Sequence, residues 1–268
     1  MYLEGLQILR LLLANERRRV LLISHAHKFI FIKPRKVAGT SVELAFSPFL
    51  KAGDLATPIE AEEELTRKYV DGLKIGKIGE KLRDHSPLAK AYTTLGESIQ
   101  AYKVVTIERN PWDRAVSQFF WSMRHSNLRD QSFSDQKYAF AKYTRRWGPT
   151  TWEDKLWGRK RQRSLSSYDL YSISGKSKAG FVLFFETLEA DLARCGDWLN
   201  FNHVVQLQGK TKATSRPKDG PHWRDFFDND LQSFVSQHCH REISAYGYQF
   251  DPDVMPRFRP FIKSGQSA

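Results

Sequence analysis

Three short apolar runs, each followed by a helical pattern, limit the possible folds of this chain more than any other sequence feature. The runs at 28–32, 103–107 and 181–185 are rich in Phe, Val and Ile, as is typical of buried strands. Helical patterns follow them at about 41–46, 112–123 and 188–199. Strands that alternate with helices favour a parallel sheet with helices on both faces. We therefore expect an α/β protein with three layers and a central parallel sheet.

The length and composition suit one domain with a sizeable core. The chain has 268 residues, of which 41% are hydrophobic. We assign 1–268 to a single domain, with an amphipathic helix at 1–24 and a basic, aromatic insertion at 124–178. The apolar part of 1–24 is too short to span a bilayer, so we expect no transmembrane segment. The two cysteines are far apart, which argues against a disulfide-based secreted scaffold and favours a cytoplasmic protein.

The formal net charge of +12 indicates a polyanionic partner. Nucleic acid, a phosphate-rich cofactor, an acidic glycan and a membrane surface all satisfy this condition. Basic residues gather at 142–163, where Trp147, Trp152 and Trp157 are interleaved with them. This segment suits an acidic or sugar acceptor, single-stranded nucleic acid, or simply a solvated helix face whose Trp side chains lie in the core.

The loop that follows the strand at 28–32, with the sequence KPRKVAGTS, has the features of an anion site. The first N–H groups of a helix attract an oxyanion, and small residues at Ala38 and Gly39 let the backbone approach it. Lys36 adds a mobile positive charge. The nucleotide-binding pattern GxxxxGK[ST] does not match, because Lys36 precedes Gly39. The alternative is a tight turn in which Arg35 and Lys36 are solvated.

A second strand–turn–helix unit, VVTIERNPWDRAVSQFFW, begins at residue 104. Arg109 ends the strand, Asn110-Pro111 gives an N-cap and first turn, and Ser117 lies two helical turns further on. An Arg fork and a Ser hydroxyl that face the same way suit a second phosphate. The alternative is that Arg109 pairs with Asp113 and that Ser117 is buried between helices.

Two further helix starts carry capping signals. Thr40 and Glu43 have the spacing of a capping box, which makes Thr40 the expected N-cap of the helix at 41–46. Ser86-Pro87 gives the same kind of signal for a helix that follows it. His85 precedes that start, where the positive helix end favours a neutral imidazole.

Together, KVAGTS after one strand and RNPWDRAVS after a later one resemble the sulfotransferases that use 3'-phosphoadenosine 5'-phosphosulfate (PAPS). The likeness is to the carbohydrate-type, sulfotransferase-2-like branch and extends over about 25–250. It implies a P-loop-NTPase-like sulfotransferase fold, a 5'-phosphosulfate loop, a 3'-phosphate site and a basic C-terminal loop that closes over the cofactor. The cofactor-binding residues that it implies are Arg35, Lys36, Val37, Ala38, Gly39, Thr40, Ser41, Arg109, Ser117, Lys212, Arg216 and Lys218.

Sulfuryl transfer to an alcohol requires stabilisation of the leaving phosphate oxygen, removal of the hydroxyl proton and in-line positioning. We assign the first task to Lys36 and the second, as general base, to His85, whose alternative role is packing at the surface. Neither the His nor the Cys residues have a metal-ligand spacing, and we expect no metal.

The expected activity is therefore transfer of a sulfuryl group from PAPS to a hydroxyl acceptor, for which we favour a carbohydrate or a glycan-linked molecule. One alternative is a nucleotide-dependent phosphotransferase, which requires magnesium and ATP. The other is a non-enzymatic nucleic-acid-binding protein, although nucleic acid is not the expected partner. The sequence specifies neither the acceptor nor the oligomeric state.

Overall fold

The computed structural model describes residues 22–56, 74–75, 86–147, 165–207, 216, 220–250 and 256–257. Several predictions from the sequence lie outside these residues. They are the N-terminal helix up to residue 21, the centre of the insertion at 148–164, His85, Lys212 and Lys218. Leu22–Ser24, which we had placed at the end of the N-terminal helix, form a strand instead.

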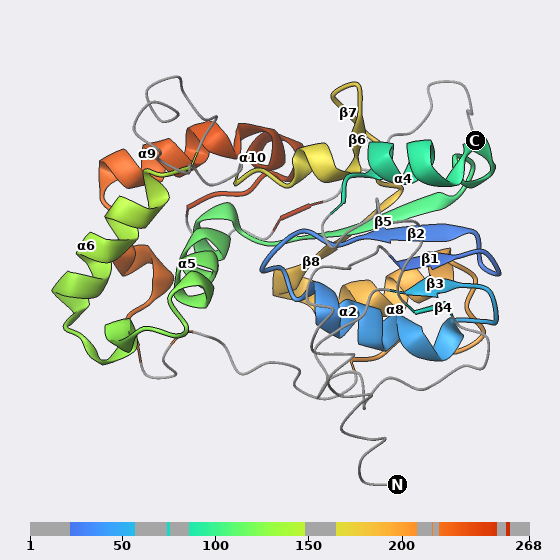
Figure 1. Ribbon diagram of the computed structural model, residues 1–268, viewed down its shortest axis with the longest axis horizontal. Coiled ribbons are helices and arrows are strands. Elements are labelled where there is room, and N and C mark those ends of the chain that lie inside the picture. Colours follow the sequence, from blue (N-terminus) through green and yellow to red (C-terminus); the bar gives the residue numbers. More distant parts are fainter. Residues whose placement is uncertain are drawn as a thin grey trace, which may run out of the picture.

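The strands form one mixed sheet in the order β4-β3-β1-β2-β5-β8 (Figure 1). Strands β2, β5 and β8 are parallel neighbours, β3 pairs parallel to β4, and β1 is antiparallel to both β2 and β3. The bounds are β1 Leu22–Ser24, β2 Phe29–Ile32, β3 Leu55–Ala56, β4 Lys74–Ile75, β5 Lys103–Glu108 and β8 Phe181–Phe184.

The expectation of a wholly parallel sheet was wrong at β1. Only residues 25–28 separate β1 from β2, whereas a parallel connection needs a crossover of a dozen or more residues. Asp54 holds this turn, because its carboxylate accepts hydrogen bonds from the Ser24 hydroxyl at 2.8 Å and the His25 N–H at 2.7 Å. The three strands predicted from the apolar runs are confirmed as β2, β5 and β8.

Helices cover both faces of the sheet, as Figure 1 shows. Alternate residues of β2 divide the core: Phe29 and Phe31 pack with helices α2 and α8, whereas Ile30 and Ile32 belong to the cluster on the opposite face. The helix bounds are α2 Gly39–Phe46, α4 Leu88–Leu95, α5 Pro111–Ser122, α6 Phe133–Thr144, α8 Leu188–Trp198, α9 Asn229–His238 and α10 His240–Tyr246.

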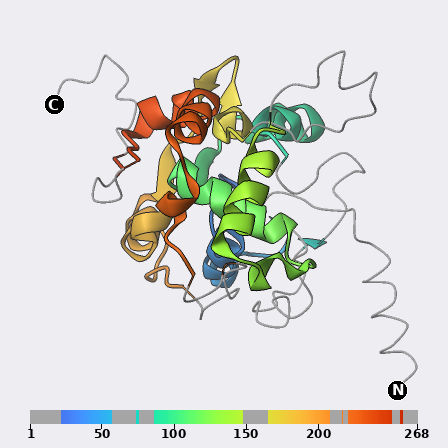
Figure 2. The same ribbon diagram turned by 90° about the vertical axis from the view of Figure 1, so that its left-hand side faces the viewer.

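Short elements complete the described part of the chain. They are the hairpin strands β6 Ser172–Ile173 and β7 Lys176–Ser177, and the 3-10 helices η1 Ser47–Phe49, η2 Glu97–Ile99, η3 Asn127–Asp130, η4 Tyr168–Tyr171, η5 Phe185–Thr187 and η6 Trp223–Phe226. Figure 2 views the molecule from the side on which α5, α6 and α9 gather. Trp147, one of the Trp residues of the basic segment, is buried in the core beside Tyr143.

Two capping predictions were wrong. Helix α2 begins at Gly39 with Ala38 as its N-cap, and no side chain caps it. Glu43 instead pairs with Lys33, whose ammonium lies 2.6 Å from the Glu43 carboxylate in a buried position. Helix α4 begins after Pro87 rather than Ser86, also without a side-chain cap. The last helical segment is divided at Cys239 into α9 and α10.

The buried Lys33–Glu43 pair gives a test of this arrangement. Glu43→Ala should lower the free energy of unfolding by about 3–5 kcal/mol, because it removes the carboxylate that compensates the buried Lys33 ammonium. The double variant Lys33→Met/Glu43→Leu should recover most of that loss by replacing both charges with apolar side chains. Urea unfolding of the two variants measures both effects. Equal destabilisation of the single and double variants would contradict the prediction.

Candidate functional site

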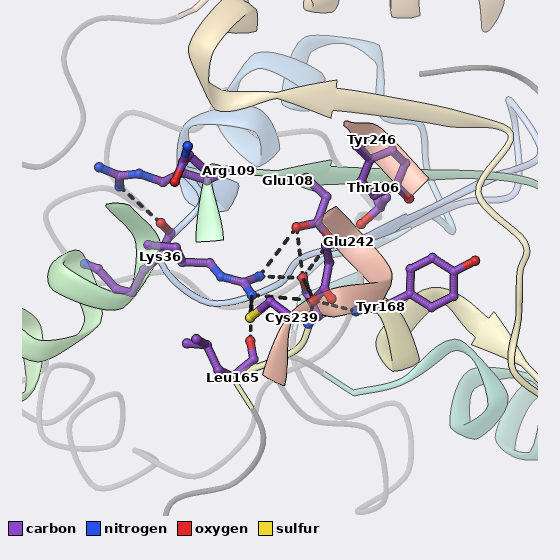
Figure 3. Close-up of polar contacts among 12 residues, drawn as sticks. Lys36, Thr106, Glu108, Arg109, Leu165, Tyr168, Cys239, Glu242 and Tyr246 are labelled. Atoms are coloured by element: carbon purple, nitrogen blue, oxygen red, sulfur yellow. Dashed lines mark hydrogen bonds and ion pairs between the residues drawn. The ribbon is translucent and has the colours of Figure 1, made fainter. Parts of the chain in front are cut away.

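Two sequence motifs meet at the carboxyl ends of neighbouring parallel strands. Strand β2 pairs with β5 so that Ile32 lies beside Thr106, and the loop after β2 therefore lies next to Arg109. The Arg109 guanidinium donates a hydrogen bond through Nη1 to the Lys36 carbonyl oxygen at 3.2 Å (Figure 3). Ligands of open α/β sheets bind at such carboxyl ends. The predicted 5' and 3' anion sites thus adjoin each other.

The loop after β2 has a strained backbone. Lys36 and Ala38 have φ values of 61° and 65°, in the left-handed region that non-glycine residues rarely occupy. Such conformations cost about 1–3 kcal/mol each and are concentrated at functional sites. Left-handed residues in a tight loop also turn successive N–H groups toward one concave side, which is how backbone anion sites are built. The left-handed residues of this loop are compatible with the predicted oxyanion site.

Side chains of this loop point in different directions. Arg35 is exposed, and Lys36, Ala38, Thr40 and Ser41 are partly buried, whereas Val37 and Gly39 are buried. Val37 belongs to the core cluster around α2, so only its backbone can serve an anion. Gly39 is required by packing, because a Cβ there would lie 2.1 Å from Lys33 Cγ.

The Lys36 ammonium reaches toward helix α5. Its Nζ lies 4.3 Å from the centroid of the Trp121 ring, in a cation–π contact. Trp121 is one turn beyond Ser117 on the same helix, and the Arg124 guanidinium lies 4.2 Å from the Trp121 ring. Sequence reasoning did not single out Trp121. An aromatic residue four positions after Ser117 was the available signal, since such residues share a helix face.

Arg109 pairs with Asp113, which was the alternative interpretation of this motif. Both Nε and Nη2 of Arg109 lie 2.6 Å from the Asp113 carboxylate, and the Phe185 ring lies 4.0 Å from the guanidinium. Arg216 approaches the same carboxylate at 2.7 Å. The structure thus brings the predicted 3'-phosphate Arg together with one residue of the predicted C-terminal basic loop.

Asp113 compensates these two cations. Burial would raise the pKa of its carboxyl, but Arg109 and Arg216 outweigh that effect and lower the pKa below its usual range. The carboxylate is therefore ionised throughout the neutral range. It orients two guanidinium groups beside the loop that contains Lys36, which leaves the surroundings electropositive.

Helix α5 begins as predicted. The Asn110 side chain accepts hydrogen bonds from the N–H groups of Trp112 at 3.1 Å and Asp113 at 3.3 Å, with Pro111 in the first turn. Ser117 is partly buried on this helix, and its hydroxyl has no hydrogen-bond partner among the residues that the structure describes. A ligand role for this hydroxyl stays a prediction.

Glu186 completes the junction between β5 and α5. Its carboxylate accepts the Asn110 N–H at 2.6 Å and faces the Tyr248 hydroxyl at 3.4 Å. Burial raises the pKa of Glu186, although the Asn110 N–H opposes that shift. Glu186 therefore fixes the backbone of the residue that follows Arg109.

His85, Lys212 and Lys218, which we predicted for the site, lie outside the described residues. Within the described ranges, no group of three or more His, Cys, Asp or Glu side chains is arranged to hold a metal ion. None of the described helices is long and apolar enough to cross a membrane.

Comparison with known proteins does not assign the chain to a family: no family model, curated protein or solved structure matches it.

The bridging role of Asp113 predicts a specific pH dependence of stability. Its lowered pKa stabilises the folded state above the unfolded pKa of 3.8, and that stabilisation is lost as the pH falls through the folded pKa. Asp113→Asn should therefore lower the free energy of unfolding by about 1–3 kcal/mol at neutral pH. The difference from wild type should shrink in acid. Urea unfolding at several pH values measures it, with exposed Asp130→Asn as the control. A deficit of the same size at all pH values would contradict the bridging role.

Proposed function

We propose that the protein is a PAPS-dependent sulfotransferase that transfers a sulfuryl group to a hydroxyl acceptor. The observation that carries this proposal is the contact between the Arg109 guanidinium and the Lys36 carbonyl oxygen. It joins two anion-binding features into one site, whereas a ligand with a single phosphate group would need only one of them. PAPS carries anionic groups at both its 5' and its 3' positions.

Each residue has a task in this proposal. The backbone N–H groups at 38–41 would surround the 5'-phosphosulfate, and Lys36 would stabilise the leaving phosphate oxygen. A guanidinium has five N–H donors, and three of those of Arg109 point at Asp113 and the Lys36 carbonyl. The remaining donors, with the Ser117 hydroxyl, would hold the 3'-phosphate. His85 would take the acceptor proton.

The parallel arrangement of β2, β5 and β8, with helices on both faces, supports the finer proposal of a P-loop-NTPase-like sulfotransferase fold. Arg216 supports a closing role for the C-terminal basic loop, because it already reaches Asp113 beside the site. A carbohydrate acceptor and a cytoplasmic setting remain predictions from the sequence.

Ligand-induced stabilisation tests the cofactor class. Adenosine 3',5'-bisphosphate at 100 times its dissociation constant should raise the free energy of unfolding by about 2.7 kcal/mol, whereas 5'-AMP at the same concentration should have a much smaller effect. Arg109→Ala should reduce the bisphosphate affinity by about tenfold to a hundredfold, which corresponds to one lost charge-assisted contact. Thermal melting and titration calorimetry measure these effects, and Arg129→Ala is a control at an exposed site.

The same measurement distinguishes the alternatives. Stabilisation by ATP and magnesium but not by the bisphosphate would overturn the proposal in favour of phosphoryl transfer. An unchanged melting temperature with every nucleotide, together with salt-sensitive binding of oligonucleotides, would favour the nucleic-acid-binding alternative.

Lys36→Ala separates chemistry from binding. Loss of the charge that stabilises the leaving oxygen should reduce the rate of sulfuryl transfer by at least about a hundredfold. Because Arg109 and Ser117 remain, binding of adenosine 3',5'-bisphosphate should weaken much less. Transfer of labelled sulfate from PAPS to a mixture of glycan acceptors measures the rate. Turnover at the wild-type level in this variant would be incompatible with the mechanism.

A further inference from the structure

A buried cluster of charged groups lies directly behind Arg109. It contains Glu108 at the end of β5, Arg114 on α5 and Glu242 on α10, each with a side chain that is 0–1% exposed. Figure 3 shows the Glu108 and Glu242 side chains close to each other, with Cys239 and Leu165 nearby. The cluster therefore joins elements that are far apart in the sequence, and the proposed function leaves it without a role.

Among the residues that the structure describes, Arg114 is the one cation that lies within ion-pair distance of both carboxylates. Its Nη1 lies 3.5 Å from Glu108 Oε2, and its Nη2 lies 3.6 Å from Glu242 Oε1. It also donates hydrogen bonds to the Ser167 hydroxyl and, at 2.6 Å, to the Leu165 carbonyl oxygen. If both carboxylates were ionised, the cluster would have an uncompensated negative charge in a site without solvent, which is costly.

The Ser167 hydroxyl lies between the two carboxyl groups. Its Oγ lies 2.7 and 2.9 Å from the two Glu108 oxygens and 3.0 Å from Glu242 Oε1. A hydroxyl has one hydrogen, so it can donate to only one of these two carboxylates. The second contact is favourable when that carboxyl carries a proton and donates it to the Ser167 oxygen.

Glu242 accepts its hydrogen bonds through Oε1, whereas its buried Oε2 has no hydrogen-bond partner among the described residues. Its Oε1 accepts hydrogen bonds from the backbone N–H groups of Ser167 and Tyr168 in addition to facing Arg114. Glu108 is joined instead by hydroxyl groups: Tyr171 donates to it at 2.8 Å, and Tyr246 donates to Tyr171 at 3.1 Å. In this arrangement the protonated Glu108 carboxyl donates a hydrogen bond to the Ser167 oxygen, and the Ser167 hydroxyl donates to Glu242.

The tyrosine hydroxyl groups and the Cys239 thiol around Glu108 stay neutral near pH 7. Burial raises the pKa of Tyr171, Tyr246 and Tyr248 above the usual range, and it does the same for the Cys239 thiol. Strand β8 presents the apolar Phe184 opposite Glu108. Burial raises the pKa of Glu108 itself to about 7, and Glu242 adds to the rise, although Arg114 and the hydroxyl groups oppose it.

We propose that Glu108 carries a proton that it donates to the Ser167 hydroxyl oxygen, and that this contact makes Glu108 a positioning residue for Arg109. While the proton is present, Glu108, Ser167 and Glu242 hold the end of β5 against α10 and the segment 165–171. When Glu108 loses the proton, two carboxylates share the Ser167 hydroxyl and the Arg114 guanidinium. Their mutual repulsion then pushes these elements apart. Arg109, the next residue after Glu108, then loses its fixed position.

The consequence for binding rests on the proposed function. Adenosine 3',5'-bisphosphate, or any ligand whose phosphate is held by Arg109, should bind more weakly as Glu108 ionises. The ligand phosphate also titrates, with a pKa of about 6, so the affinity of wild type alone does not isolate this effect. Glu108→Gln gives the required reference, because it has the shape and hydrogen-bonding capacity of the protonated side chain and does not titrate.

Titration calorimetry of the bisphosphate from about pH 6 to about pH 8.5 compares wild type with Glu108→Gln. Across this pH range, the ratio of the wild-type dissociation constant to that of the variant should rise by about threefold or more. That factor is equivalent to a difference of about half a unit between the pKa of Glu108 in the free protein and in the complex. Asp169→Asn removes an exposed carboxylate from the same segment and should keep the wild-type profile. A constant ratio would overturn the positioning role.

Thermal unfolding without ligand tests the protonation of Glu108 independently of binding. A raised carboxyl pKa stabilises the folded state below the unfolded value of 4.5, and this contribution is lost as the pH rises through about 7. The melting temperature of wild type should therefore fall relative to Glu108→Gln over that range. Parallel melting curves would exclude the proton. Absence of bisphosphate binding in wild type at every pH would overturn the proposed function and the positioning role together, while the melting curves would still test the proton.

Discussion

The parallel pairing of β2 with β5 is the constraint on which the candidate site depends. It aligns the carboxyl ends of two strands whose loops contain Lys36 and Arg109. The Thr106 hydroxyl donates to the Ile32 carbonyl oxygen at 3.1 Å, so the pairing is fixed by a buried side-chain contact as well as by the ladder. This pairing also explains the Arg109–Lys36 hydrogen bond, and it places the two predicted anion sites next to each other.

Local signals in the sequence predicted the parts of the fold that depend on nearby residues. The apolar run at 103–107 identified β5, and Asn110-Pro111 identified the start of α5, because a strand needs apolar faces and a cap needs its acceptor two or three residues away. The start of α2 was placed wrongly, because Glu43 has a long-range partner in Lys33 that competes with the local cap.

Contacts between distant segments could not be predicted in this way. Arg216 reaches Asp113 across 103 positions, and Ser167 meets Glu242 across 75, and no pattern in the sequence marks these pairs. The site residues Lys36, Arg109 and Ser117 came from motif spacing, and the structure places the first two in contact. The second role of Asp113, which serves Arg216 as well as Arg109, required coordinates.

These separations also bear on how the protein folds. The contact between Ile32 and Thr106 closes 74 positions of chain, and the Arg216–Asp113 pair closes more. Parallel sheets with such distant pairings fold slowly, because loop-closure entropy must be overcome before the contacts form. A partly folded chain with only its local helices and turns would lack the Arg109–Lys36 contact altogether. The candidate site is therefore complete only in the folded domain, and it should form in the last cooperative step of folding.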